Sequence, residues 1–189
     1  MSRPAKRAAS TREAATKKRS ARAEGGEPGA LVEVGARAPA FNLRGGDGKK
    51  HALAAYKGTP VVLYFYPRDQ TPGCTQEACD FRDSHREIVR SGGVVLGISP
   101  DSTDSHGDFA ASLGLPFVLL SDEPSAEGIP AVCDRYGVWQ KKSMYGKSFM
   151  GVVRTTYLID GRGRVARRWD RVSVRGHADD VVSALRALA

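Results

Sequence analysis

The stretch YFYPRDQTPGCTQEACDFRD, residues 64–83, joins the end of an apolar segment to the start of a helical one. The preceding run PVVLYFY, residues 60–66, is continuously apolar, β-branched or aromatic, which is typical of a strand covered on both faces of a sheet. Thr71 is a candidate N-cap, Pro72 suits the first helical position, and Gly92-Gly93 ends the helical run. We therefore predict a central strand, a short loop and a long helix.

Outward from this unit, strand-like and helix-like segments alternate. VVLGIS (94–99) and PFVLLS (116–121) are predicted as buried strands on either side of a helix over 102–114. Two glycine-rich turns, Gly45-Gly46-Asp47-Gly48 and Gly161-Arg162-Gly163, predict hairpins, and HADDVVSALRAL predicts a final helix. The stretch between residues 121 and 152 is less regular. The pattern predicts an α/β domain with a central mixed sheet flanked by helices.

Size and composition point to one ordinary domain. The 189 residues suffice for a single hydrophobic core, and no run approaches the roughly 18 apolar residues of a membrane span. The N-terminus lacks the apolar core of a secretory signal, so we expect a soluble, cytoplasmic protein with no membrane partner. Three cysteines are too few for a disulfide scaffold, and any bridge is expected to be transient and catalytic.

The positive charge is concentrated at the N-terminus. Residues 1–30 carry eight Lys and Arg against three Glu (8 − 3 = +5), whereas residues 31–189 carry 21 against 18 (+3). Because residues 1–30 contain no aromatic side chain, we predict a disordered basic tail followed by one domain over residues 31–189. The tail is compatible with a solvated extension, with a weak nucleic-acid contact that places the protein at the nucleus or nucleoid, or with an organelle transit peptide.

Cys74 stands where a reactive side chain is expected. In open α/β sheets the reactive crevice tends to lie at the carboxyl ends of the strands, and Cys74 follows the central strand at a helix N-terminus. A thiol reacts as its thiolate, which unpaired backbone N–H groups and the positive end of the helix dipole stabilise. Cys74 is therefore a candidate nucleophile.

Cys79 lies five residues further along the same predicted helix. Five helical residues rise about 7.5 Å and turn about 500°, so the two thiols point to different faces and cannot bond within an intact helix. Either the pair never bonds, or the first turns unwind for it to do so; two ordinary core cysteines are a further alternative. The spacing lacks the CxxC pattern of thioredoxins and the ligand pairs of a zinc site, and no metal is expected.

Pro67, Thr71 and Cys74 together resemble the active-site motif of the peroxiredoxins, thiol peroxidases with a thioredoxin-like fold. The extended stretch over residues 64–83 is similar to the peroxiredoxin Q subfamily, also called bacterioferritin comigratory protein. Further segments resemble that subfamily in the same order, from about residue 34 to the end of the chain: GISPDS, LPFVLLSD, YGVW, KSMYGKSFMGVVRTTYLID and VRGHADDVVSAL. The resemblance implies a thioredoxin-like fold.

The resemblance also implies a role for each matching residue. Cys74 would be the peroxidatic cysteine and Cys79 the resolving cysteine. Thr71 would hydrogen-bond the thiolate and the peroxide, unless it is a plain N-cap. Pro67 would close the pocket against water and fix the turn. Arg154 matches the family arginine that stabilises the thiolate and steadies the peroxide, unless it is an ordinary surface arginine.

The implied activity is reduction of hydrogen peroxide and organic hydroperoxides by a monomer without cofactor. A Cys74–Cys79 disulfide would form and then be reduced by thioredoxin or a similar dithiol. Two rivals stay open: a nucleic-acid-associated redox sensor that uses the tail, and a general disulfide oxidoreductase on the same fold.

The third cysteine, Glu77 and the four histidines are not predicted to be catalytic. Cys133 is predicted to be a spectator thiol, with a mixed disulfide or alternative resolving role left open. Glu77 is predicted to be an ordinary first-turn acid of the helix, with electrostatic support of the active-site helix as the alternative. Of the histidines, His177 is placed at the start of the last helix, His85 on a helical stripe, and His51 and His106 in turn or polar segments.

Overall fold

The structure is a computed structural model that describes residues 29–188. Residues 1–28 of the predicted basic tail lie outside the described residues, so its disorder stays a prediction. In the described part of the chain, no helix is long and apolar enough to cross a membrane.

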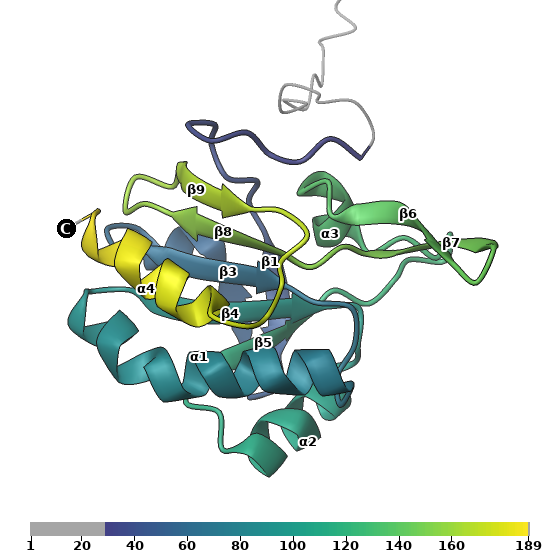
Figure 1. Cartoon of the computed structure of the whole chain (residues 1–189), viewed down its shortest axis with the longest axis horizontal. Helices are drawn as coiled ribbons and strands as arrows, with labels where there is room; N and C mark the ends of the chain where they lie inside the picture. Colours follow the sequence, from purple (N-terminus) through teal and green to yellow (C-terminus); the bar gives the residue numbers. More distant parts are fainter. Residues whose placement is uncertain (1–28, 189) are drawn as a thin grey trace, which may run out of the picture.

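A seven-stranded mixed sheet forms the centre of the molecule, in the order β2-β1-β5-β4-β3-β8-β9 (Figure 1). Strand β3 (Val61–Phe65) is buried along its whole length and pairs in parallel with β4 (Val94–Ser99) and antiparallel with β8 (Thr155–Ile159). The continuous apolar run therefore forms an internal strand, which confirms the predicted central strand and mixed sheet. The other strands are β1 (Asn42–Gly45), β2 (Lys50–Ala52), β5 (Val118–Ser121) and β9 (Val165–Trp169).

Three helices cover one face of the sheet: α1 (Pro72–Arg90), α2 (Thr103–Leu113) and α4 (His177–Arg186) (Figure 1). Strands β3, β4 and β5 are consecutive and parallel, so right-handed crossovers place α1 and α2 on the same side. The opposite face is covered by the short helix α3 (Ala131–Arg135) and a 3-10 turn, η1 (Leu53–Tyr56). Alternate side chains of β3 enter the two cores.

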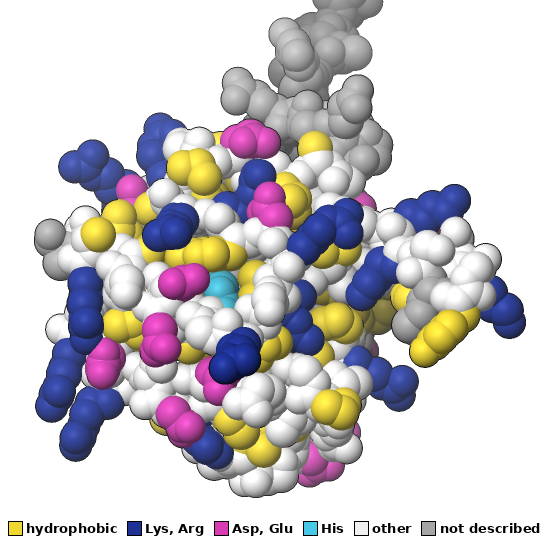
Figure 2. Space-filling model, in the orientation of Figure 1, with side chains coloured by type: hydrophobic (Ala, Val, Ile, Leu, Met, Phe, Trp, Pro, Cys, Tyr) yellow, Lys and Arg dark blue, Asp and Glu magenta, His cyan; other side chains and the backbone are white. Residues whose placement is uncertain are grey.

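Both glycine-rich turns join antiparallel strands, β1 to β2 and β8 to β9, as predicted. The less regular stretch contains a third hairpin that the sequence did not indicate: β6 (Trp139–Met144) and β7 (Lys147–Val152). This hairpin pairs outside the main sheet and projects from the body (Figure 1), with dark-blue basic side chains around it (Figure 2). Its turn, Tyr145-Gly146, has positive φ at both residues, which suits a two-residue hairpin loop.

Candidate active site

Cys74 is the third residue of α1, directly after the loop that leaves the carboxyl end of β3. Its side chain is buried, with 2% of its surface exposed. The N-cap residue Thr71 makes no side-chain capping bond; its Oγ1 instead donates to the carbonyl of Arg68 at 3.1 Å. The positive end of the α1 dipole therefore faces the thiol without competition from a capping oxygen.

Arg154 reaches the thiol from the segment between β7 and β8. Its Nη2 donates to Cys74 Sγ at 3.2 Å, and its side chain is only 15% exposed. Gly73 allows this approach, because a Cβ atom there would lie 3.3 Å from Nη2. The guanidinium therefore places a positive charge and an N–H donor directly beside the sulfur.

Glu77 is the buried counter-ion of Arg154, and its assignment as an ordinary first-turn acid is wrong. The side chain is 1% exposed, and Oε2 accepts a hydrogen bond from Arg154 Nη1, whereas Oε1 is buried and has no hydrogen-bond partner among residues 29–188. Burial raises the pKa of Glu77 from 4.5 to about 7, although Arg154 acts to lower that pKa. Its position one helical turn after Cys74 is the sequence signal that could have identified it.

Glu77 should make the stability of the protein depend on pH. Because its pKa is near 4.5 in the unfolded chain and about 7 in the fold, the folded state holds an extra proton between these values. The unfolding free energy should therefore fall, by up to about 3 kcal/mol, as the pH rises from about 5 to about 7. Glu77→Gln should remove this slope in denaturant titrations at several pH values, and Glu87→Gln, at an exposed position of the same helix, should keep it. Parallel slopes in the two variants would contradict the assignment.

Cys79 is half-buried on α1, and Cys74, Cys79 and Cys133 are all free thiols. The intact helix keeps Cys74 and Cys79 on different faces, so a bond between them requires the first turns of α1 to unwind. Cys74 and Ala78 both belong to the core beneath α1 and would leave it in that step.

Cys133 lies in α3, in the core on the other face of the sheet. It is fully buried, and its backbone N–H donates to Asp122 Oδ2 at 2.7 Å. Burial, followed by the nearby Asp122 carboxylate, raises the pKa of the Cys133 thiol well above its usual range. The sheet stands between this thiol and Cys74, an arrangement that favours a spectator role.

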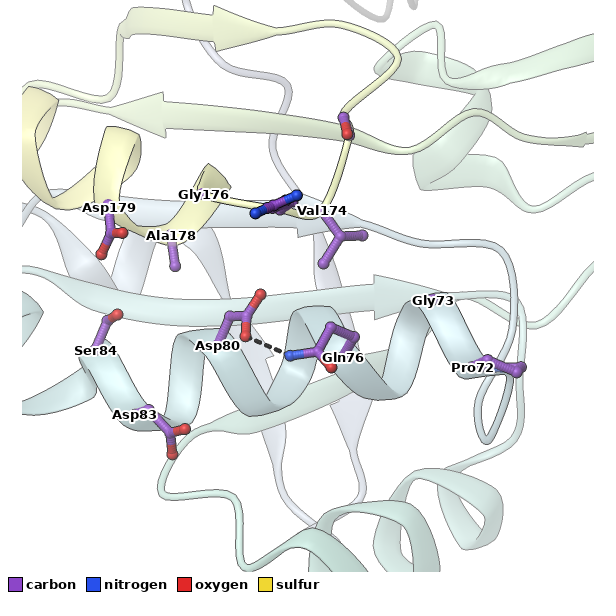
Figure 3. A pocket seen from close by; sticks show the side chains of 12 residues that line it. Pro72, Gly73, Gln76, Asp80, Asp83, Ser84, Val174, Gly176, Ala178 and Asp179 are labelled. Atoms are coloured by element: carbon purple, nitrogen blue, oxygen red, sulfur yellow. Dashed lines mark hydrogen bonds between the residues drawn. The ribbon is translucent and has the colours of Figure 1, made fainter.

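An open cleft of about 690 Å³ runs beside the first half of α1, opposite the segment that leads into α4 (Figure 3). Pro72, Gly73, Gln76 and Asp80 line it from α1, and the Gln76 amide donates to Asp80 at 2.7 Å. Cys74 is not among the lining residues, since it faces the core. The cleft therefore borders the site without opening onto the sulfur.

The other residues singled out from the sequence lie around the same loop. Pro67 is half-buried where the chain leaves β3. His106 was predicted to lie in a turn or polar segment. It lies in α2 and is fully buried. His177 begins α4 as predicted; its Nε2 lies 2.8 Å from Thr156 Oγ1, and burial lowers its pKa to about 4.

A buried thiol at the start of the helix that follows the central strand, with an arginine beside it, is the arrangement of a thiol-dependent oxidoreductase on a thioredoxin-like fold. The model of the AhpC/TSA family matches residues 34–168. The chain belongs to the AhpC/TSA family.

Within that family, its curated relatives are peroxiredoxins of the Bcp or Q type. Peroxiredoxin Bcp of Bacillus subtilis is 42% identical over 158 residues, which cover 84% of this chain and 98% of the relative. A putative peroxiredoxin bcp of Coxiella burnetii is 46% identical over 154 residues, which cover 82% of this chain and 99% of the relative. A solved structure of the bacterioferritin comigratory protein of Xanthomonas campestris, described for its alkyl peroxide reduction activity, superimposes with a TM-score of 0.72 at 41% identity, over 78% of this chain and 90% of that one. The chain is accordingly a thiol-dependent peroxidase that uses a peroxide and a thioredoxin-type reductant.

Proposed function

We propose that Cys74 is the peroxidatic thiol and Cys79 the thiol that resolves its oxidised form, with hydrogen peroxide and organic hydroperoxides as substrates. The observation that carries this assignment is the 3.2 Å contact between Arg154 Nη2 and Cys74 Sγ at the N-terminus of α1. The alkyl peroxide reduction described for the Xanthomonas relative supports the organic substrates.

In the first step, the Cys74 thiolate attacks the nearer peroxide oxygen. A sulfur–oxygen bond forms as the oxygen–oxygen bond breaks, the sulfur becomes a sulfenic acid, and the departing oxygen takes a proton to leave as water or an alcohol. Negative charge grows on that departing oxygen. Arg154 and the unpaired N–H groups of the first turn of α1 are fixed donors beside the sulfur, and they would stabilise this charge more than the ground state.

In the second step, the Cys79 thiol attacks the Cys74 sulfenic acid. A disulfide forms and water leaves, after the first turns of α1 have unwound to bring the two sulfurs together. A dithiol protein, which we propose to be thioredoxin, then reduces the disulfide and α1 forms again. Both thiols and Arg154 come from one chain, which supports action as a monomer.

Thr71 and Pro67 are proposed to shape the peroxide pocket. Thr71 Oγ1 donates to Arg68 in the described structure, so contact with a peroxide would require its hydroxyl to change partner. Pro67 lies at the start of the loop, half-buried, where it would limit the access of water. The nucleic-acid alternative depends on the tail, which lies outside the described residues, and the relatives lend it no support.

The pairing can be tested by mass mapping of the protein after one equivalent of hydrogen peroxide, together with thioredoxin-coupled turnover. We expect a Cys74–Cys79 bridge in the unmodified protein. Cys79→Ser should stop turnover while leaving the first oxidation intact, because the sulfenic acid still forms. The matched control Cys133→Ser should turn over as the parent does. Retention of turnover in Cys79→Ser and its loss in Cys133→Ser would assign the resolving role to Cys133.

A further inference from the structure

A buried polar cluster lies behind the loop that connects β3 to α1. At its centre, His106 of α2 is 0% exposed, and its Nδ1 lies 2.8 Å from Oδ2 of Asp69, which is itself almost fully buried. On the other side of the ring, Nε2 lies 3.2 Å from the carbonyl oxygen of Leu120. The imidazole therefore bridges the loop on one side and strand β5 on the other.

The partners of His106 fix the orientation of its ring. The Leu120 carbonyl can only accept, so the hydrogen bond at Nε2 is donated by the imidazole. At the opposite edge of the ring, Nδ1 is hydrogen-bonded to the Asp69 carboxyl group. Tyr66 Oη also lies 3.3 Å from Nδ1, but its hydroxyl donates to Asp69.

Asp69 is held from every side. Its Oδ1 accepts from Tyr66 Oη at 2.7 Å, its Oδ2 accepts from Ser105 Oγ at 2.7 Å, and its backbone N–H donates to Asp101 Oδ2 at 2.9 Å. Burial acts to raise the pKa of Asp69, yet the bonds from His106, Ser105 and Tyr66 hold it below its ordinary value. The carboxylate thus ties the loop to Tyr66, directly after β3, and to α2, and the backbone N–H ties it to the segment after β4.

The tethered loop carries backbone strain beside the catalytic helix. Gln70, the residue after Asp69, has φ of 58°, a left-handed conformation that a side chain with a Cβ atom adopts at a cost. Thr71, the N-cap of α1, follows at once, and Cys74 lies three residues further on. A strained loop at this point persists only where its surroundings hold it, and Asp69 makes the buried bonds that hold this one.

We propose that Asp69 and His106 are a positioning pair that holds the loop over residues 67–71 in the conformation from which Cys74 reacts with peroxide. The pair makes no hydrogen bond to Cys74, Arg154 or Glu77, and it acts through the start of α1. Releasing the loop frees the strain at Gln70 and shifts the first turns of α1 toward the unwound form that joins Cys74 to Cys79. The proposal deepens the function proposed above and rests on it.

The two chemical steps respond in opposite directions to loss of the pair. Oxidation of Cys74 needs the folded loop and helix, whereas formation of the disulfide needs the helix unwound. Asp69→Asn and His106→Asn should each slow sulfenic acid formation tenfold or more, because misplacement by about 1 Å can cost 10²-fold in rate. Disulfide formation should be as fast as in the parent or faster. A variant that is only less stable would not separate the steps in this way.

Each step can be measured alone. The first is followed by quenched flow and mass analysis in a Cys79→Ser background. The second is followed by the conversion of sulfenic acid to disulfide in chains that keep Cys79, at peroxide concentrations high enough that oxidation of Cys74 no longer limits the rate. The double variant Asp69→Asn/His106→Asn should lose no more than either single variant, since the two residues act as a unit. Tyr136→Phe is the matched control: it removes a buried side chain's hydroxyl, which donates to the Pro39 carbonyl on the far face of the sheet.

The outcomes separate this proposal from the proposed function. Parallel slowing of both steps, or changes no larger than those of Tyr136→Phe, would overturn the positioning role. Should the asparagine variants fail to fold, Ser105→Ala and Tyr66→Phe each remove a single hydrogen bond to Asp69. We expect each of them to slow sulfenic acid formation by a smaller factor and to leave disulfide formation as fast as in the parent. Amide hydrogen exchange over residues 72–79 adds a readout independent of peroxide: faster exchange in the variants supports the pair, and unchanged exchange refutes it, even if Cys74 proves not to be peroxidatic.

Discussion

Cys74→Ser is expected to reduce peroxide consumption to the level of the buffer and reductant alone. A serine hydroxyl is a much weaker nucleophile than a thiol or thiolate, and Arg154 and the start of α1 would then surround a side chain that does not react with peroxide. The loss should exceed about a thousandfold, as is usual when a covalent nucleophile is removed. The measurement is hydrogen peroxide consumption coupled to thioredoxin and its reductase.

The control for Cys74→Ser is a check that the variant is folded. Serine is nearly isosteric with cysteine at this buried position, so circular dichroism and the melting temperature should change little. Turnover at even a tenth of the parental rate would remove Cys74 from the role of nucleophile. The remaining candidates would then be Cys79 and Cys133, both free thiols.

Arg154→Ala should have the second largest effect, on rate and on stability together. Its guanidinium contacts the Cys74 sulfur through Nη2 and the Glu77 carboxylate through Nη1. Loss of one donor that stabilises developing charge typically costs about 10²–10³ in rate. Removal of one partner of a buried ion pair costs about 3–5 kcal/mol of unfolding free energy, because Glu77 is left buried without its counter-charge.

Two further variants separate these effects. Arg154→Lys should recover little of the rate. The lysine ammonium group cannot reproduce the planar guanidinium, which contacts the Cys74 sulfur and the Glu77 carboxyl group at the same time. Adding Glu77→Gln to Arg154→Ala should return part of the stability and none of the rate. The control Arg164→Ala removes an arginine whose Nη1 donates to the Gly35 carbonyl, and it should leave the second-order rate constant with peroxide unchanged. An equal loss in Arg164→Ala and Arg154→Ala would contradict the role of Arg154.

Local signals explain what could be predicted of the fold. The run over residues 60–66 is buried on both faces because β3 is an internal strand, and the loop, Pro72 and Gly92-Gly93 bound α1 as expected. The hairpin of β6 and β7 was missed because it packs outside the main sheet, where no strict apolar alternation is imposed on it.

The site was predicted only in part, for a different physical reason. The family resemblance drew attention to Cys74 and Arg154, which the fold brings into contact, but Glu77 and His106 look like surface residues in sequence. Each is buried because a hydrogen-bonding partner reaches it from far along the chain: Arg154 is 77 positions from Glu77, and Asp69 is 37 from His106. Such burial depends on tertiary pairing, which local periodicity does not report.

The placement of Cys74 and Ala78 in the core beneath α1 has a consequence for the energetics of the redox cycle. Under the proposed pairing, oxidation exposes apolar surface, so the disulfide form should unfold with a smaller heat-capacity change than the dithiol form. The ring closed by a Cys74–Cys79 disulfide is short, so the bond lowers the entropy of the unfolded chain little and offsets little of the lost burial. Reduction lets the core close again, which stabilises the dithiol and raises the reduction potential of the pair, so that the disulfide is readily reduced by a thioredoxin-type dithiol.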